Sequence, residues 1–182
     1  QPEKSIDYEV GFQQKLTNAS SLKLSAFVRE QRDMIQVRQL TGAYPINMKT
    51  YDNVDFGTVK GFTLGYDLRR TKNVLFKATY TLQFANATGS DATTGTNLIS
   101  AGQPNLRTTL PTDFDQRHAL NVILDYRFSD GKQYNGPKLF GKDIFANAGA
   151  NFVIQAGSGT PYTKRNINSG YVVGKINGSR MP

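Results

Sequence analysis

The sequence predicts an all-β fold, an antiparallel meander of about six or seven strands with the features of a transmembrane β-barrel. Apolar and polar residues alternate with period 2 along most of the chain, which is typical of strands with one dry and one wet face. The alternating stretches run for about 9–14 residues, whereas soluble strands usually have about 5–6. Shorter and longer connections also tend to alternate, as in a barrel with tight turns at one end. A soluble β-sandwich or barrel fits the alternation too, but the strand length favours the membrane barrel.

The first predicted hairpin joins strands near residues 5–16 and 21–39 through a turn of small polar residues. In the first strand, apolar residues occupy every second position from Ile6 to Phe12. The second strand loses its alternation after Glu30 and regains it farther along. We therefore expect two long antiparallel strands at the start of the chain.

The second predicted hairpin joins strands near 54–69 and 74–85 through a tight turn rich in basic residues. Alternate positions from Phe62 to Leu68 are apolar on the third strand, and glycine, threonine and charged residues lie between them. The fourth strand has the most regular alternation in the chain. These two strands are therefore the most clearly predicted pair.

Three more strands are expected in the second half, near 117–128, 144–156 and 171–177. A segment of medium length joins the fifth to the sixth strand. The other connections are long and polar, and alternate connections of a meander lie at opposite ends of the sheet. Large loops are therefore expected at one end: residues 40–53, 86–116 and 157–170.

Composition excludes several kinds of site. The 182 residues include no cysteine, which excludes disulfides and thiolate metal ligands. The single histidine, His118, excludes a multi-histidine metal centre. Mean hydropathy is −0.47, which fits strands that give lipid only every second residue. The net charge of +8 suggests nucleic acid, but the aromatic residues alternate onto the apolar face instead of joining the basic ones, so no nucleic-acid partner is expected.

Four stretches of the sequence resemble, in the right order, parts of the TonB-dependent outer-membrane receptor barrels. The opening QPEKSIDYEVG is similar to the start of a late barrel strand, and YDNVDFGTVKGF to a loop-to-strand segment. DFDQRHALN is similar to a "DQRH.LN" strand start, and SGTPYT to an "SG.PYT" element. The likeness is greatest to the Oar-like receptors of Bacteroidetes, which carry a carboxypeptidase-regulatory-like domain.

The resemblance implies a Gram-negative outer-membrane protein with a barrel of about 22 strands around a plug. It implies active import of a scarce solute, with energy from TonB in the periplasm. The chain is then expected to be part of a larger, incomplete barrel. Its implied partners are outer-membrane lipid, the TonB complex through an N-terminal segment that this chain lacks, an unknown ligand and a surface lipoprotein or other outer-membrane protein.

Two other functions stay open at this point. The barrel could act as a structural or secretion-associated partner without import, or the chain could be a soluble β-sandwich binding module. Under all three hypotheses we expect no catalytic residue, no cofactor and no metal site, so the protein is not expected to be an enzyme.

The polar face of the predicted strands carries the first set of candidate site residues. In a lipid-embedded barrel these charges have to face the lumen, since an Arg or Lys facing lipid at the midplane costs about 2–4 kcal/mol. There they could hold a plug, line a substrate path or simply be solvated. The set is Asp7, Glu9, Arg29, Asp67, Arg69, Lys77, Asp125 and Arg127.

A second set lies where the fifth strand begins: Asp113, Asp115, Arg117 and His118. Such a group could suggest acid–base chemistry or a metal site. A metal site usually needs several converging nitrogen or carboxylate ligands, and here only the single imidazole and the two carboxylates qualify. We therefore expect a hydrogen-bonded rim at the entry of the strand.

Overall fold

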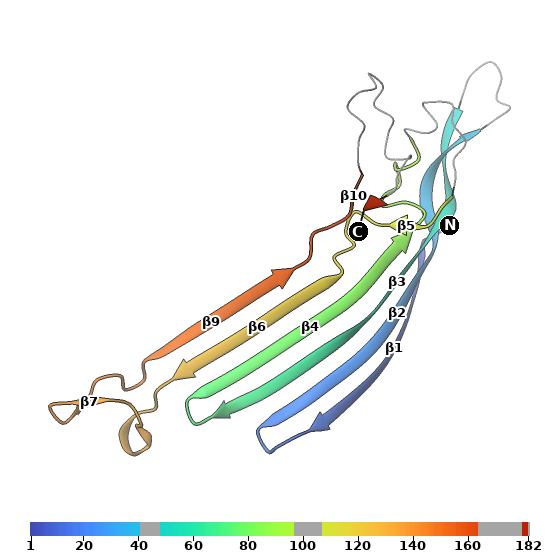
Figure 1. Cartoon of the computed structure of the whole chain (residues 1–182). Helices are drawn as coiled ribbons and strands as arrows, with labels where there is room; N and C mark the ends of the chain where they lie inside the picture. Colours follow the sequence, from blue (N-terminus) through green and yellow to red (C-terminus); the bar gives the residue numbers. More distant parts are fainter. Residues whose placement is uncertain (41–47, 97–106, 164–179, 182) are drawn as a thin grey trace, which may run out of the picture.

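The computed structural model describes residues 1–40, 48–96, 107–163 and 180–181. Its main body is one antiparallel sheet in the order β1-β2-β3-β4-β6-β9, so consecutive long strands are neighbours (Figure 1). The strands are β1 (Lys4–Lys15), β2 (Ser20–Leu40), β3 (Met48–Thr71), β4 (Val74–Ala87), β5 (Leu110–Pro111), β6 (His118–Arg127) and β9 (Gly149–Gly157). The short β5 pairs with the end of β4. Within these ranges, no helix is long and apolar enough to cross a membrane.

The register places the apolar side chains on one face of the sheet. One row across it consists of Phe12, Leu24, Leu64, Tyr80, Leu120 and Ala156. This apolar face is uncovered: Val10 is 74% exposed and Phe152 57%. The only buried hydrophobic residues of the described part are Val37, Ala85 and Ala87. A single layer without a core does not fit a soluble β-sandwich, whose two sheets bury their facing sides.

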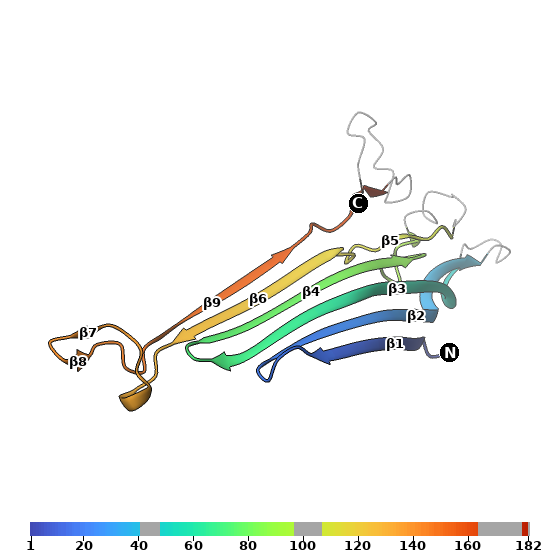
Figure 2. The ribbon, with the colours of Figure 1, turned by 60° about the horizontal axis from the view of Figure 1, so that its bottom comes forward.

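Every glycine of these long strands lies on the opposite, polar face: Gly11, Gly57, Gly61, Gly65, Gly149 and Gly157. A Cβ atom on Gly61 would lie 2.2 Å from the backbone oxygen of Leu82 and 3.0 Å from Cζ of Phe27. Bending a sheet crowds the side chains on its inner side, and glycine relieves that crowding. Figure 2 shows the bend of the sheet. From the glycines we assign the polar face to its concave side and the apolar face to its convex side.

The predicted loop at 40–53 is wrong for its last six residues, because 48–53 belong to β3. They pair with the second half of β2, ending with Leu40 opposite Met48. The register shifts between Gln31 and Ile35, and such a β-bulge reverses which positions face which side. The bulge explains why the alternation of this strand fades in the sequence although the strand continues.

Three other predicted boundaries also differ. The strand expected at 144–156 begins at Gly149, because residues 145–148 form a turn in which the Ala148 amide donates to the Phe145 carbonyl. The expected loop 86–116 gives its first two residues to β4 and contains β5. In the loop expected at 157–170, Gly157 ends β9, and β10 (Tyr162–Thr163) pairs with β11 (Arg180–Met181). The strand expected at 171–177 lies outside the described residues.

The connections divide the sheet into two ends. At the turn end lie the connections 16–19, 72–73 and 128–148; the last contains the 3-10 turn η1 (Gly131–Gln133) and the small hairpin β7 (Lys138–Leu139) and β8 (Lys142–Asp143). At the opposite, loop end, the chain leaves β2, β4 and β9 (Figure 1). The connection 88–117 there is longer than any at the turn end, but the turn-end connection 128–148 is longer than 41–47, so the two ends differ less than the sequence predicts.

Candidate functional site

The register brings the eight predicted polar-face charges to the concave face. Asp7 lies opposite Arg29 and Asp67 opposite Lys77. Asp125 pairs with Asn151, and Arg127 with Gly149, at the other side of the sheet. The predicted charges therefore share one face of the sheet and lie on every long strand except β9.

The best-defined ion pair on this face joins β1 to β2. Arg29 donates through Nε to Oδ1 of Asp7 at 2.7 Å and through Nη2 to Oδ2 at 2.9 Å. This fork-to-fork geometry fixes the direction of both side chains. Since both side chains are about half exposed, the pair serves to orient charge more than to stabilise the sheet.

Two further pairs lie toward the turn end. Nζ of Lys77 is 3.9 Å from Oδ1 of Asp67. Asp125 binds Arg70, a residue that the sequence places in a turn. The register shift between Leu68 and Thr71 brings Arg70 to this ladder; the only signal in the sequence is the Arg-Arg pair before the turn. Arg70 therefore belongs to the charged face although it was not predicted there.

Other charges on this face have no ion-pair partner within 4.0 Å among the described residues: Glu9, Lys15, Lys23, Arg69 and Arg127. Four of these five are basic. A hollow of about 300 Å³ at the turn end is lined by two of them and by Asp67. Toward the loop end, a second hollow of about 200 Å³ lies between the Asp7–Arg29 pair and Gln83. The face can therefore hold an anionic group at its turn end.

In the predicted rim at 113–118, a side-chain hydrogen bond joins β4 to the segment that enters β6. Residues 113–116 leave the ladder between β4 and β6, so the amide of Ala85 has no backbone acceptor opposite it. Oδ1 of Asp115 accepts this hydrogen bond at 2.8 Å. Asp115 is only 1% exposed, and its Oδ2 lies 3.6 Å from Nε of Arg117. A buried carboxylate thus replaces a missing strand partner.

The same junction holds the segment after β9. Nε2 of Gln116 donates to the carbonyl of Ser158 at 3.0 Å, and the amide of His118 donates to the Ser158 hydroxyl at 3.2 Å. A Cβ atom on Gly157 would lie 2.2 Å from Nε2 of Gln116, so a side chain there would displace this flexible amide. Two of the stretches that carry the resemblance, DQRH and SG, therefore bind each other.

The rim residues do not converge on one site. Nδ1 of His118 hydrogen-bonds to the hydroxyl of Tyr80 at 2.8 Å, whereas Asp115 faces Ala85 and Arg117. Asp113 is exposed, and its amide donates to the Ser90 hydroxyl. Across the described ranges, no three His, Cys, Asp or Glu residues are grouped to hold a metal ion.

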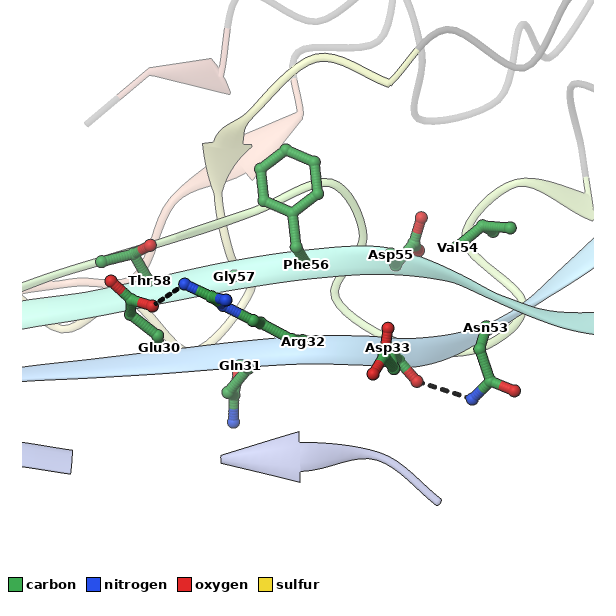
Figure 3. Close-up of a pocket in the computed structure, with 10 residues that line it drawn as sticks. All are labelled: Glu30, Gln31, Arg32, Asp33, Asn53, Val54, Asp55, Phe56, Gly57 and Thr58. Carbon is green, nitrogen blue, oxygen red and sulfur yellow. Dashed lines mark hydrogen bonds and ion pairs between the residues drawn. The ribbon is translucent and has the colours of Figure 1, made fainter. Parts of the chain in front are cut away.

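A further hollow, of about 450 Å³, lies at the β2 bulge and was not predicted (Figure 3). It is lined by Glu30–Asp33 and 53–58, and its side chains are mostly polar. Arg32 binds Glu30 at 2.6 Å, and Nδ2 of Asn53 donates to the carbonyl of Asp33 at 2.6 Å. Asp33, at the bulge, has a φ of 57°. This left-handed conformation is usual for glycine at a bulge, and here an aspartate adopts it. The hollow can take a polar ligand group beside the exposed ring of Phe56.

Comparisons with known proteins agree with this architecture. No curated protein and no solved structure matches the chain. The family model described as "TonB dependent receptor-like, beta-barrel" matches residues 1–178. The finer likeness to Oar-like receptors of Bacteroidetes stays a prediction. Together with the single-layer antiparallel sheet, the match shows that the chain belongs to the TonB-dependent receptor-like β-barrel family of outer-membrane receptors and transporters.

Proposed function

We propose that this chain is part of the wall of a receptor that binds a ligand at the cell surface and imports it with energy transmitted by TonB. One observation carries the proposal: a single bent sheet has an uncovered apolar convex face and a charged concave face. Lipid covers the first face and the second lines the lumen. The TonB complex would be contacted by a part of the receptor outside this sheet.

The distribution of charge supports this orientation. The predicted charges lie on the concave side along the sheet, whereas the charges that share the apolar face, such as Glu30 and Lys60, lie toward its loop end. Placing one of them against the hydrocarbon midplane would cost about 2–4 kcal/mol for Arg or Lys. The concave face therefore faces water or a lumenal domain, and its free basic residues are suited to hold acidic groups of either a plug or a passing solute.

The hollow at the β2 bulge supports ligand contact at the loop end. In outer-membrane barrels the longer loops are extracellular and the short turns periplasmic. The hollow lies on the loop-end half of β2 and β3, beside the first residues of β1, where Lys4 pairs with Arg32 (Figure 3). We propose that Arg32, Asn53 and Phe56 contact a polar ligand group at the loop end of the barrel. A surface lipoprotein or another outer-membrane protein stays a predicted partner, and we propose no bond-making or bond-breaking chemistry.

Growth of the bacterium that carries the gene tests import. Deleting the gene of the full-length receptor should abolish growth on at least one limiting nutrient, and the wild-type gene should restore it. A receptor whose TonB-contacting segment is removed should reach the outer membrane but fail to restore growth. Full restoration by this uncoupled receptor would overturn the import proposal and favour the structural or secretion-associated alternative.

The proposed ligand contact has its own test in the same strain. An Arg32→Ala, Asn53→Ala double variant should raise the nutrient concentration needed for half-maximal growth several-fold. Lys72→Ala, at an exposed position in the β3–β4 turn, is the control and should leave that concentration unchanged. Equal growth of the double variant and the wild type would remove this hollow from the ligand path without affecting the import proposal.

A further inference from the structure

The connection 128–148 at the turn end is folded against the apolar side of the sheet. Tyr126 lies on the apolar face of β6, opposite Val74. Its ring meets that of Phe128 edge to face, with 5.1 Å between centroids. Phe128 in turn contacts Phe145 at 5.8 Å and Tyr134 at 6.2 Å. This aromatic cluster places the base of the connection on the side of the sheet that faces lipid.

A pair of asparagines anchors the connection. Asn73, in the β3–β4 turn, is 4% exposed. Its Nδ2 donates to Oδ1 of Asn135 at 2.7 Å, and Nδ2 of Asn135 donates back to Oδ1 of Asn73 at 2.5 Å. The hydroxyl of Tyr134 also binds within the connection, donating to the Pro137 carbonyl at 2.6 Å. The connection is therefore held in one position relative to the membrane-spanning strands.

The tip of the β7–β8 hairpin is an exposed phenylalanine in an unfavourable conformation. Leu139 pairs with Lys142, so the turn has only two residues, Phe140 and Gly141. Both have positive φ, 50° and 73°, as a type I′ turn requires. Asn-Gly is the preferred pair there, because a bulky side chain is strained at positive φ. Phe140 is nevertheless 95% exposed, so no packing in the described chain offsets this strain.

The surroundings of Phe140 indicate what covers it. Leu139 and Ile144 beside it are 56% and 49% exposed. Lys142, which pairs with Leu139, is exposed and has no ion pair in the parts of the chain that the structure describes. The acidic residue of the hairpin is engaged, since Asp143 lies 3.6 Å from Nζ of Lys138.

An apolar aromatic tip beside a lysine without an ion pair, Lys142, matches the chemistry of a phospholipid surface. Aromatic rings prefer the boundary between headgroups and acyl chains, and a lysine nearby binds lipid phosphates. We propose that the β7–β8 hairpin inserts Phe140 into the phospholipid leaflet at the turn end, with Lys142 on the lipid phosphates. Figures 1 and 2 show the hairpin projecting beyond the ends of β6 and β9, clear of the sheet. The proposal rests on the membrane placement of the barrel and not on ligand import.

Spin labelling of the full-length receptor in vesicles of phosphatidylethanolamine and phosphatidylglycerol tests the insertion. A nitroxide at Leu139→Cys should collide readily with oxygen and several-fold less with a water-soluble nickel chelate. The matched control is a nitroxide at Asn18→Cys, an exposed position in the β1–β2 turn at the same end, which should collide readily with the chelate. This chain contributes no competing cysteine; any elsewhere in the receptor is replaced by serine.

A second variant separates insertion from folding. Phe140→Asn creates the Asn-Gly pair that a type I′ turn prefers, so the hairpin should fold at least as well. With the label at position 139, this variant should raise collisions with the chelate to the level of the control. Replacing phosphatidylglycerol by phosphatidylcholine should produce a smaller change in the same direction.

Three results would overturn the proposal. The label at position 139 could be as accessible to the chelate as the control, which would place the tip in water. Phe140→Asn could leave a low accessibility unchanged, which would show that Phe140 does not hold the hairpin in the leaflet. A label shielded from both oxygen and the chelate would indicate a protein partner instead. None of these measurements reads nutrient uptake, so a failure here leaves the import proposal standing.

Discussion

Replacing Asp115 by alanine is the sharpest test of the junction between β4 and β6. The change removes the oxygen that accepts the Ala85 amide at 2.8 Å in a buried site. A buried amide without an acceptor costs about 1–3 kcal/mol. The lost ion pair adds little, because Nε of Arg117 is 3.6 Å away without hydrogen-bond geometry and that side chain is about one-third exposed. We expect Asp115→Ala to destabilise the junction by about 1–3 kcal/mol.

Hydrogen exchange measured by mass spectrometry on the full-length receptor reads this effect locally. Peptides that contain Ala85 should exchange faster by roughly 5- to 150-fold in Asp115→Ala, the range equivalent to 1–3 kcal/mol. Asp115→Asn is the matched control: its amide oxygen can still accept the hydrogen bond while the charge is lost. The reasoning is refuted if Asp115→Asn accelerates exchange as much as Asp115→Ala, or if exchange at Ala85 does not change in Asp115→Ala.

Three further substitutions test the faces and the connections. Gly61→Ala should destabilise the barrel by about 1–3 kcal/mol, because the new Cβ would lie 2.2 Å from a backbone oxygen of β4, and heat-modifiability gels should show a smaller folded fraction. Gly65→Ala is the control: its Cβ would lie 3.8 Å from the nearest neighbour, so this variant should fold like the wild type. Exchanging the charges of Asp7 and Arg29 should preserve folding, and each single reversal should lower the melting temperature slightly at low salt and not at high salt. If the double exchange lowered the melting temperature as much as a single reversal, the two side chains would not interact. Asn73→Ala should speed proteolysis within 128–148 in isolated outer membranes, and unchanged cleavage would contradict the anchoring role.

Alternation alone is sufficient to assign faces where the ladder is regular. The strands β1, β4 and β6 contain no bulge, so their side chains alternate regularly between the two faces. The sequence therefore places Asp7, Lys77 and Asp125 on one face, as the register does. The positions of the glycines indicate the concave side of the sheet less directly than alternation indicates the two faces. Glycine on the polar face is visible in the sequence, but only the close approach of Leu82 to Gly61 shows why it is needed.

Local irregularities defeat the same reasoning. The bulge at Gln31–Ile35 interrupts the alternation of β2 and hides the strand that continues beyond it. The shift after Leu68 moves Arg70 from an expected turn to a partner of Asp125. Both depend on which residues the neighbouring strand presents, and a single sequence does not contain that pairing.

By itself the sequence determined the class of this protein. A period-2 pattern over long stretches requires strands with one apolar face, and the ordered motifs indicate a TonB-dependent receptor barrel, which the family match confirms. Only the tertiary structure decided what its polar residues do. Asp115 substitutes for a strand partner, and Phe140 stands at the tip of a hairpin, because register and turn geometry set their neighbours. Periodicity depends on spacing along the chain, whereas these roles depend on contacts between residues that lie far apart in it.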